Sequence, residues 1–188
     1  MREILAASPL IAAVRREEDL PLARESQAKV IFLLCGDINT VPRMVTALHD
    51  AGKRPFLHLD LVQGFGHDRP AMRFIASRVR PTGILTTKSH LIRMGKEEGL
   101  ACIQRLFIFD NQSLTTAVTQ SKANGPAAVE VMPGVLPDSV LRQLVGEISL
   151  PVIAGGLVRT RQEAARILKT GVAAVSVGSP ALWSGPLL

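Results

Sequence analysis

Short apolar runs rich in β-branched residues alternate with longer amphipathic stretches along the whole chain. Each run has the length and composition of a strand that is buried on both faces. Eight such runs occur, at residues 10–14, 30–34, 56–60, 83–87, 102–109, 127–132, 152–154 and 173–177. The stretches with helical periodicity lie between them, at residues 42–51, 69–78, 90–98, 113–123, 138–147 and 161–170. Regular alternation of strands and helices predicts a parallel sheet.

Eight strands, each followed by a helix, is the number that closes a parallel sheet into a (β/α)8 TIM-type barrel. We expect this α/β fold as a single domain over residues 1–188. An open doubly wound sheet is the alternative. A barrel typically needs about 250 residues, and this chain stops soon after Trp183. We therefore expect a compact barrel with a truncated last helix, and we expect residues 2–7 to cover the wall that this helix leaves open.

The charge of the chain indicates a polyanionic partner. The formal net charge is +6 and the isoelectric point is near 10, and a basic surface attracts phosphate groups. Six phenylalanines, one tryptophan and no tyrosine are too few to predict an exposed base-stacking platform, so RNA contacts would depend mainly on Arg and Lys. No apolar run is long enough to cross a bilayer, and we expect a cytoplasmic protein with no membrane partner.

Two adjacent glycines mark the loop after the seventh run. Gly155 and Gly156 stand between the apolar residues and a helix start, and in barrels a phosphate commonly binds between the loops after strands 7 and 8. In the second of these loops Gly178 ends the last run, Ser179 can cap a helix and Pro180 suits its first turn. We predict that backbone N–H groups of both loops hold a phosphate. The alternative is that the glycines serve only tight turns.

Four charged residues interrupt or follow the apolar runs. Asp60 ends the third run, Lys88 follows the fourth, Arg105 lies in the fifth and Glu130 in the sixth. Burial in a barrel is unfavourable for such groups unless each meets a partner or a ligand. They could converge on one mouth and bind a small polyol. They could equally form an internal ion-pair network, for instance Arg105 with Glu130 or Asp60.

The residues that usually carry chemistry form no recognisable motif. His49, His58, His67 and His90 have no metal-ligand spacing, and the chain has no nucleophile elbow, P-loop or zincin motif. We therefore predict no metal, no cofactor and no catalytic residue. Lys88 at a strand end leaves an alternative open, because such lysines form Schiff bases in some barrels.

Several segments together resemble a known family. The segments are HLDLVQGFGHD, GILTTKSHLI, GLACIQRLFIFDNQSL, VEVMPGVLPD, IAGGLVRT and AVSVGSPALW, and they run in order from about residue 9 to Trp183. They are similar to the glycerol-3-phosphate-responsive antiterminators of bacterial glycerol uptake operons. The resemblance implies a (β/α)8 fold, glycerol 3-phosphate as effector ligand, and binding to the leader messenger RNA of the glycerol operon so that a terminator is bypassed. Such a protein is a regulator and not an enzyme.

The resemblance also assigns residues. Those assigned to the ligand are Asp60, Lys88, Arg105, Glu130, Gly155, Gly156, Gly178 and Ser179. The chain departs from the family pattern at Gln63 and at Val177–Gly178, which leaves room for a relative with another ligand. For RNA, helical spacing groups a few basic residues on two faces, although such faces are usually only solvated. These candidates are Arg69, Arg73 and Arg80 on one helix or at its end, and Arg166 and Lys169 on another.

A second hypothesis remains beside the regulator. (β/α)8 barrels host many enzymes, so the fold alone favours an aldolase, isomerase or lyase acting on a small phosphorylated metabolite. In that case Lys88 or Arg105 would act with Glu130 or Asp60 as acid and base. A third hypothesis is a ligand sensor with a protein partner. All three hypotheses allow a homo-oligomer.

Overall fold

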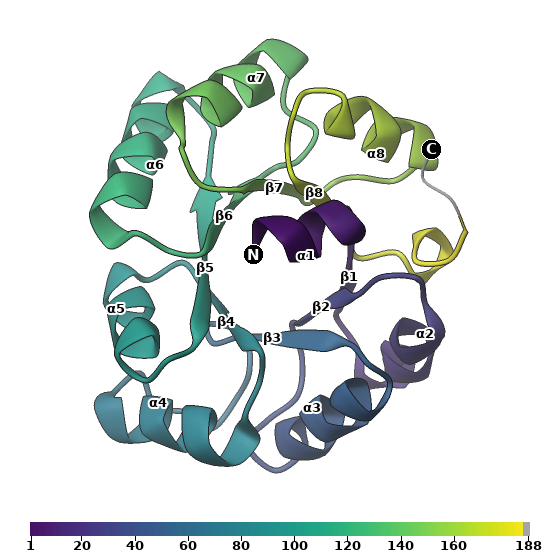
Figure 1. Cartoon of the computed structure of the whole chain (residues 1–188), viewed down its shortest axis with the longest axis vertical. Coiled ribbons are helices and arrows are strands. Elements are labelled where there is room, and N and C mark those ends of the chain that lie inside the picture. The colour runs from purple at the N-terminus through teal and green to yellow at the C-terminus, as the bar shows by residue number, and fades with distance from the viewer. Residues whose placement is uncertain (186–188) are drawn as a thin grey trace.

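Strand β1 pairs with β8 as well as with β2, so the parallel sheet has no free edge. In the computed structural model, which describes residues 1–185, each strand is hydrogen-bonded to the next in chain order and the barrel is closed (Figure 1). The strands are β1 (Leu10–Val14), β2 (Val30–Leu33), β3 (Arg54–His58), β4 (Gly83–Thr86), β5 (Ala101–Phe107), β6 (Ala128–Met132), β7 (Val152–Gly155) and β8 (Ala174–Val177). The predicted (β/α)8 barrel and its eight strands are confirmed.

Helices surround the barrel, as the periodicity predicted. They are α2 (Leu20–Glu25), α3 (Val41–Asp50), α4 (Arg69–Phe74), α5 (Ser89–Glu97), α6 (Asn111–Asn124), α7 (Asp138–Glu147) and α8 (Arg161–Leu168). Short turns of other helix types are η1 (Glu17–Asp19), η2 (Ile75–Val79) and η3 (Pro180–Leu182). Helix α2 was not predicted, because six residues with Pro21 in the first turn are too few to show a period. Within the described part of the chain, every helix falls short of the length and hydropathy that a membrane-spanning segment requires.

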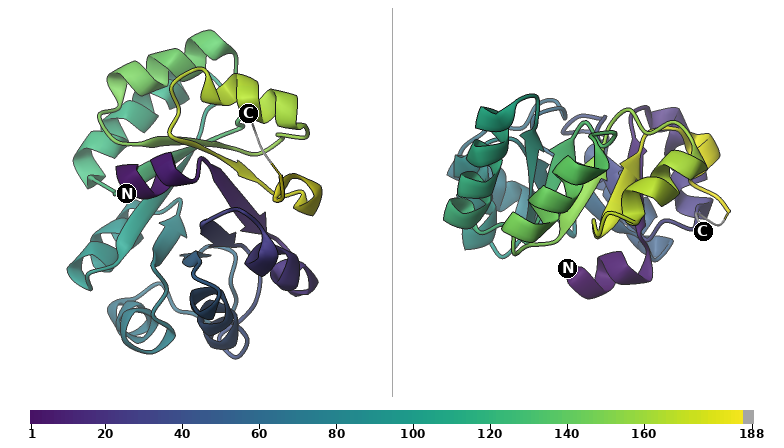
Figure 2. Two further views of the ribbon diagram at one scale, coloured as in Figure 1. Left: turned by 45° about the vertical axis from the view of Figure 1, so that its right-hand side comes forward. Right: turned by 90° about the horizontal axis from the view of Figure 1, so that it is seen from above.

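Helix α1 (Arg2–Ala7) lies across the amino-terminal end of the barrel and not on its wall (Figure 2). Its Leu5 is fully buried and packs in the interior cluster with side chains of the strands, such as Phe32 and Phe56. The prediction that residues 2–7 cover the open wall is therefore wrong. The helix plugs one end of the barrel because its apolar residues find the interior layer and not the outer one.

The wall beside β8 is filled by a single turn and a tryptophan. Turn η3 ends in front of Trp183, whose side chain is 1% exposed and whose indole N–H donates to the Val177 carbonyl at 2.8 Å. The Gln27 N–H donates to the Trp183 carbonyl at 3.3 Å, which ties this turn to the loop after α2. The predicted truncated last helix is thus confirmed, and a large aromatic side chain replaces most of the missing helix.

Candidate functional site

The interior of the barrel holds a buried ion pair near the carboxyl ends of its strands. Arg105 Nε donates to Glu130 Oε2 at 2.7 Å, and Ser176 Oγ donates to Glu130 Oε1 at 2.5 Å. Glu130 is fully buried and the Arg105 side chain is 8% exposed. A carboxylate in such a place needs both a cation and hydrogen bonds to offset its desolvation. The pairing of Arg105 with Glu130, which the sequence offered as one alternative, is therefore present.

The glycines after β7 have separate reasons to lack side chains. A Cβ at Gly155 would overlap the Ser176 hydroxyl and the Glu130 carboxylate, so the hydrogen bond between those two groups requires a glycine here. Gly156 has φ +81°, a left-handed conformation, and a Cβ there would lie 2.5 Å from Cε of Met132. Packing inside the barrel thus explains in part why the sequence has two adjacent glycines after β7. Contact of either glycine with a phosphate stays a prediction.

Asp60 ties the loop after β3 to the end of β4. It lies two residues beyond the end of β3, outside the strand in which the sequence placed it. Its carboxylate accepts hydrogen bonds from the Thr87 N–H at 2.7 Å, the Thr87 hydroxyl at 3.0 Å and the Thr86 hydroxyl at 3.0 Å. Desolvation by burial acts to raise the pKa of Asp60, but these hydrogen bonds outweigh it and the pKa is lowered. Asp60 is therefore a charged anchor for two loops.

Lys88 and two histidines surround this anchor. Lys88 Nζ lies 2.8 Å from Nδ1 of His67 and 3.8 Å from an Asp60 carboxylate oxygen. His58, at the end of β3, is 2% exposed, and its Nδ1 lies 4.0 Å from Asp60 without a hydrogen-bond partner among residues 1–185. Burial, followed by the positive charge of Arg105, lowers the pKa of His58 to about 4. The structure thus brings Asp60 and Lys88 together in a cluster of their own.

A cavity of about 830 Å³ opens at the carboxyl ends of the strands. Its lining contains five of the predicted ligand residues, which are Arg105, Glu130, Gly156, Gly178 and Ser179. Ser176 also lines it, so the cavity reaches down to the buried Arg105–Glu130 pair. The position agrees with the general rule that barrels bind their ligands at this face.

Two arginines that were not predicted also line this cavity. Arg15 directly follows β1, and Arg159 lies in the loop between β7 and α8. Within residues 1–185 neither guanidinium forms an ion pair with a carboxylate, so both are available to an anion. Both arginines could have been predicted from the sequence, because each follows an apolar strand at the end where barrels bind ligands. Lys88 was selected as a charged residue directly after an apolar run, and Arg15 meets the same criterion.

The loop after β8 differs from its prediction in one respect. Gly178 lies beside Arg15, whose Cδ is 3.1 Å from the position that a Cβ at Gly178 would occupy. Ser179 precedes η3, and Pro180 is in the first turn, as predicted, but the Ser179 side chain makes no capping hydrogen bond. A single 3₁₀ turn also lacks the aligned peptide dipoles of a full helix. Binding at this loop would therefore depend on Arg15 and on local N–H groups.

Residues 10–183 match the family described as glycerol-3-phosphate responsive antiterminators. The chain belongs to this family. It is 34% identical over 181 residues to the uncharacterized protein YgcP of Escherichia coli, a match that covers 96% of this chain and 94% of that protein.

Two solved structures of antiterminator proteins share the barrel. The glycerol uptake operon antiterminator regulatory protein of Listeria monocytogenes has 28% identity and a TM-score of 0.87, over 94% of this chain and 95% of that one. The glycerol uptake operon antiterminator-related protein of Thermotoga maritima has 32% identity and a TM-score of 0.81, over 94% of this chain and 98% of that one. The antiterminator family resemblance seen in the sequence is therefore confirmed.

Most of the basic residues predicted to contact RNA in this antiterminator are engaged within the protein. Arg69 pairs with Glu97 at 2.9 Å, Arg73 with Glu98 at 3.6 Å, and Arg166 with Asp138.

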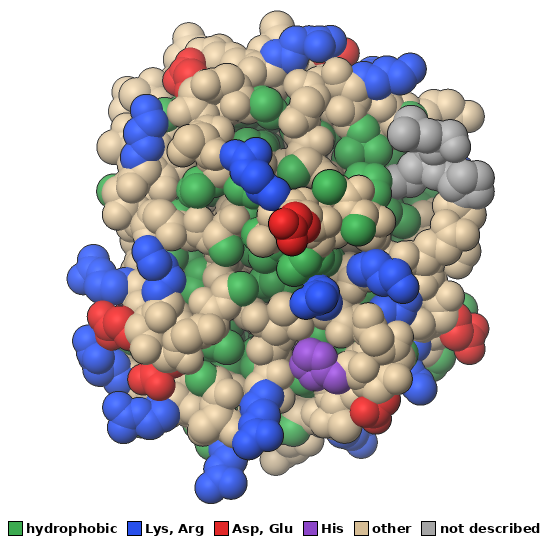
Figure 3. All heavy atoms as spheres, viewed as in Figure 1, with side chains coloured by type: hydrophobic (Ala, Val, Ile, Leu, Met, Phe, Trp, Pro, Cys, Tyr) green, Lys and Arg blue, Asp and Glu red, His purple; other side chains and the backbone are tan. Residues whose placement is uncertain are grey.

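The last two RNA candidates lie outside regular helix. Arg80 follows η2 with φ +54° and its Nε donates to the Ser77 carbonyl, so it lies at the end of the helical segment that carries Arg69 and Arg73, which the prediction allowed. Lys169 is the residue after α8, so that helix ends before it. Figure 3 shows that Lys and Arg side chains are scattered widely over the face crossed by α1. On this face the basic side chains are thus spread out and form no single patch.

Proposed function

We propose that this antiterminator binds glycerol 3-phosphate in the cavity at the carboxyl ends of the strands, and that the ligand controls its binding to the leader RNA of a glycerol uptake operon. The family match supports both the ligand and the kind of target. The net charge of +6 suits a polyanion such as RNA. The protein would act in the cytoplasm, where such transcripts are made.

The observation that carries the proposal is the chemical difference between the two ends of the cavity. The outer end has Arg15, beside Gly178, and Arg159, and neither arginine has a carboxylate partner among residues 1–185. The inner end has Glu130 and Ser176, oxygen-bearing groups that accept hydrogen bonds from hydroxyls. Glycerol 3-phosphate has an anion at one end and hydroxyl groups at the other. Charge-assisted bonds from the arginines to the phosphate would fix its orientation.

Ligand binding would act by shifting a conformational equilibrium and not by chemistry. The groups that an enzyme would use as acid and base are held by partners, since Lys88 contacts His67 and Glu130 is bound by Arg105 and Ser176. A ligand that joins the loops after β1, β7 and β8 would favour the conformation in which those loops are close. Coupling of this kind is typically worth about 1–3 kcal/mol.

The test is a titration of labelled leader RNA with the purified protein at fixed moderate salt, with and without glycerol 3-phosphate. We expect RNA affinity to rise about five- to a hundredfold with the ligand. Glycerol and inorganic phosphate, each alone, are the matched control ligands. RNA affinity that does not depend on glycerol 3-phosphate would refute ligand control. Consumption of glycerol 3-phosphate in the absence of RNA would favour an enzyme instead.

A further inference from the structure

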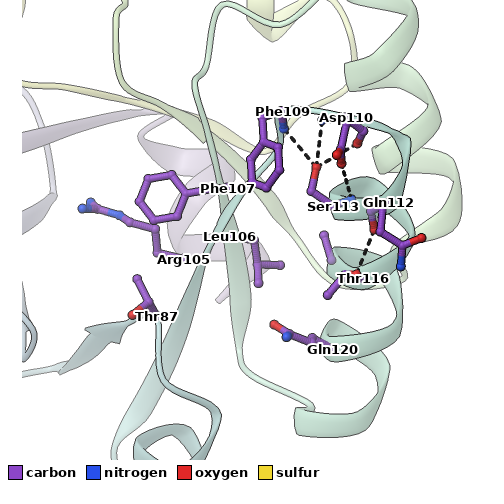
Figure 4. Close-up of a pocket in the computed structure, with 11 residues that line it drawn as sticks. Thr87, Arg105, Leu106, Phe107, Phe109, Asp110, Gln112, Ser113, Thr116 and Gln120 are labelled. Carbon is purple, nitrogen blue, oxygen red and sulfur yellow. Dashed lines mark hydrogen bonds between the residues drawn. The ribbon is translucent and has the colours of Figure 1, made fainter.

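A second pocket, of about 330 Å³, lies between the carboxyl end of β5 and helix α6 (Figure 4). Two phenylalanines line its edge and are exposed to solvent, Phe107 by 53% and Phe109 by 81%. The composition predicted too few aromatic residues for an exposed stacking surface, yet two of the six phenylalanines stand here. Exposed aromatic side chains grouped at one pocket commonly mark a binding surface.

The wall opposite the phenylalanines is polar and largely uncharged. Helix α6 contributes Gln112, Thr116 and Gln120 to the lining of the pocket, and Figure 4 shows where each is attached along this helix. Within residues 1–185 the Gln112 amide has no hydrogen-bond partner of its own, which leaves both its donor and its acceptor free. Asp110 begins the helix and accepts the Ser113 N–H at 2.7 Å. Amide groups and a carboxylate of this kind recognise the donor and acceptor edges of planar ligands.

This pocket and the barrel cavity share a wall. Arg105 and Phe107 line both of them. Arg105 is the residue that holds Glu130 at the floor of the barrel cavity. A ligand that moves either side chain therefore changes the shape of the pocket beside α6.

We propose that the α6 pocket takes one unstacked base of a single-stranded RNA, which stacks on Phe107 and Phe109 and pairs its edge with the amides of α6. This inference rests on the proposed function and deepens it, because it names a contact with the RNA and a route from the ligand. Sequence-specific RNA recognition commonly uses splayed bases, aromatic stacking and edge hydrogen bonds. The pocket volume suits one base with its ribose.

The test compares leader RNA binding by the unaltered protein, Phe109→Ala and Phe74→Ala at saturating glycerol 3-phosphate. Phe74 is 41% exposed on α4 and is the matched control. Loss of one stacked base should lower affinity by about fivefold or more for Phe109→Ala and leave Phe74→Ala unchanged. Phe107→Ala should also reduce the ratio of affinities with and without glycerol 3-phosphate. Ultraviolet crosslinking with mass spectrometry should place the crosslinked nucleotide on the peptide that contains both phenylalanines.

The outcomes separate this inference from the proposed function. Failure of the unaltered protein to bind leader RNA would overturn both. RNA binding that Phe109→Ala leaves unchanged, with crosslinks elsewhere, would overturn only the inference. If sedimentation shows a dimer that Phe109→Ala dissociates while RNA binding persists, the phenylalanines cover a contact between copies of this chain and the inference is wrong. Thermal unfolding of each variant checks that it is folded.

Discussion

Glu130 and Ser176 are joined by a 2.5 Å hydrogen bond although β7 lies between their strands. The bond passes in front of Gly155, the residue of β7 that is the Cα partner of Ser176. Only a residue without a side chain leaves that path open. The geometry explains why an apolar strand ends in glycine, and it connects the polar floor of the cavity to the packing of the barrel.

Gly155→Ala should destabilise the protein. The added methyl group would meet the Ser176 hydroxyl and the Glu130 carboxylate, and overpacking of this kind costs about 1–3 kcal/mol. The control is Gly146→Ala, because nothing lies within 4 Å of a Cβ at that position of helix α7. The control should gain up to about 1 kcal/mol from better helix propensity. Urea unfolding measures the free energy of unfolding of both variants. An unchanged free energy of unfolding for Gly155→Ala would contradict this account of the glycine.

Removal of the Arg105 guanidinium should cost more than removal of an exposed arginine. Arg105→Leu leaves the fully buried Glu130 without its cation, which typically destabilises a protein by about 3–5 kcal/mol. Arg78→Ala, an exposed arginine in η2, is the control and should change stability by less than about 0.5 kcal/mol. Equal midpoints for the two variants in urea unfolding would show that the buried pair contributes little.

The strands were predictable because each is a short run of buried, β-branched residues, and the closed order followed from their number. Charged residues such as Glu130 were also visible, because they interrupt apolar runs. The hydrogen bond from Ser176 to Glu130 could not be predicted, since it depends on how barrel closure places β6 and β8 around β7. The exposure of Phe109 could not be predicted from sequence spacing either, because it is set by the turn into α6. Tertiary geometry decided each of these.

Arg15 and Arg159 should both contribute to binding of glycerol 3-phosphate. Each presents a guanidinium to the outer end of the cavity, and a charge-assisted hydrogen bond is worth about 1.5–3 kcal/mol. Arg15→Ala and Arg159→Ala should therefore each lower the affinity for glycerol 3-phosphate by about tenfold or more, as measured by calorimetric titration. Arg78→Ala serves again as control. If both alanine variants bind the ligand as the unaltered protein does, the phosphate lies elsewhere.

Stability should fall as pH drops from about 6.5 to about 4, because of His58. Burial, and then Arg105, lowers the pKa of His58 from its ordinary 6.5 to about 4, so in this window only the unfolded chain takes up the proton. The contribution of neutral His58 to the free energy of unfolding is fully present above pH 6.5. Up to about 3 kcal/mol of it is lost as the pH falls from 6.5 to 4. His58→Gln should flatten this slope in urea unfolding, whereas the exposed His90→Gln should keep it. A slope unchanged in His58→Gln would mean that other groups bind the protons.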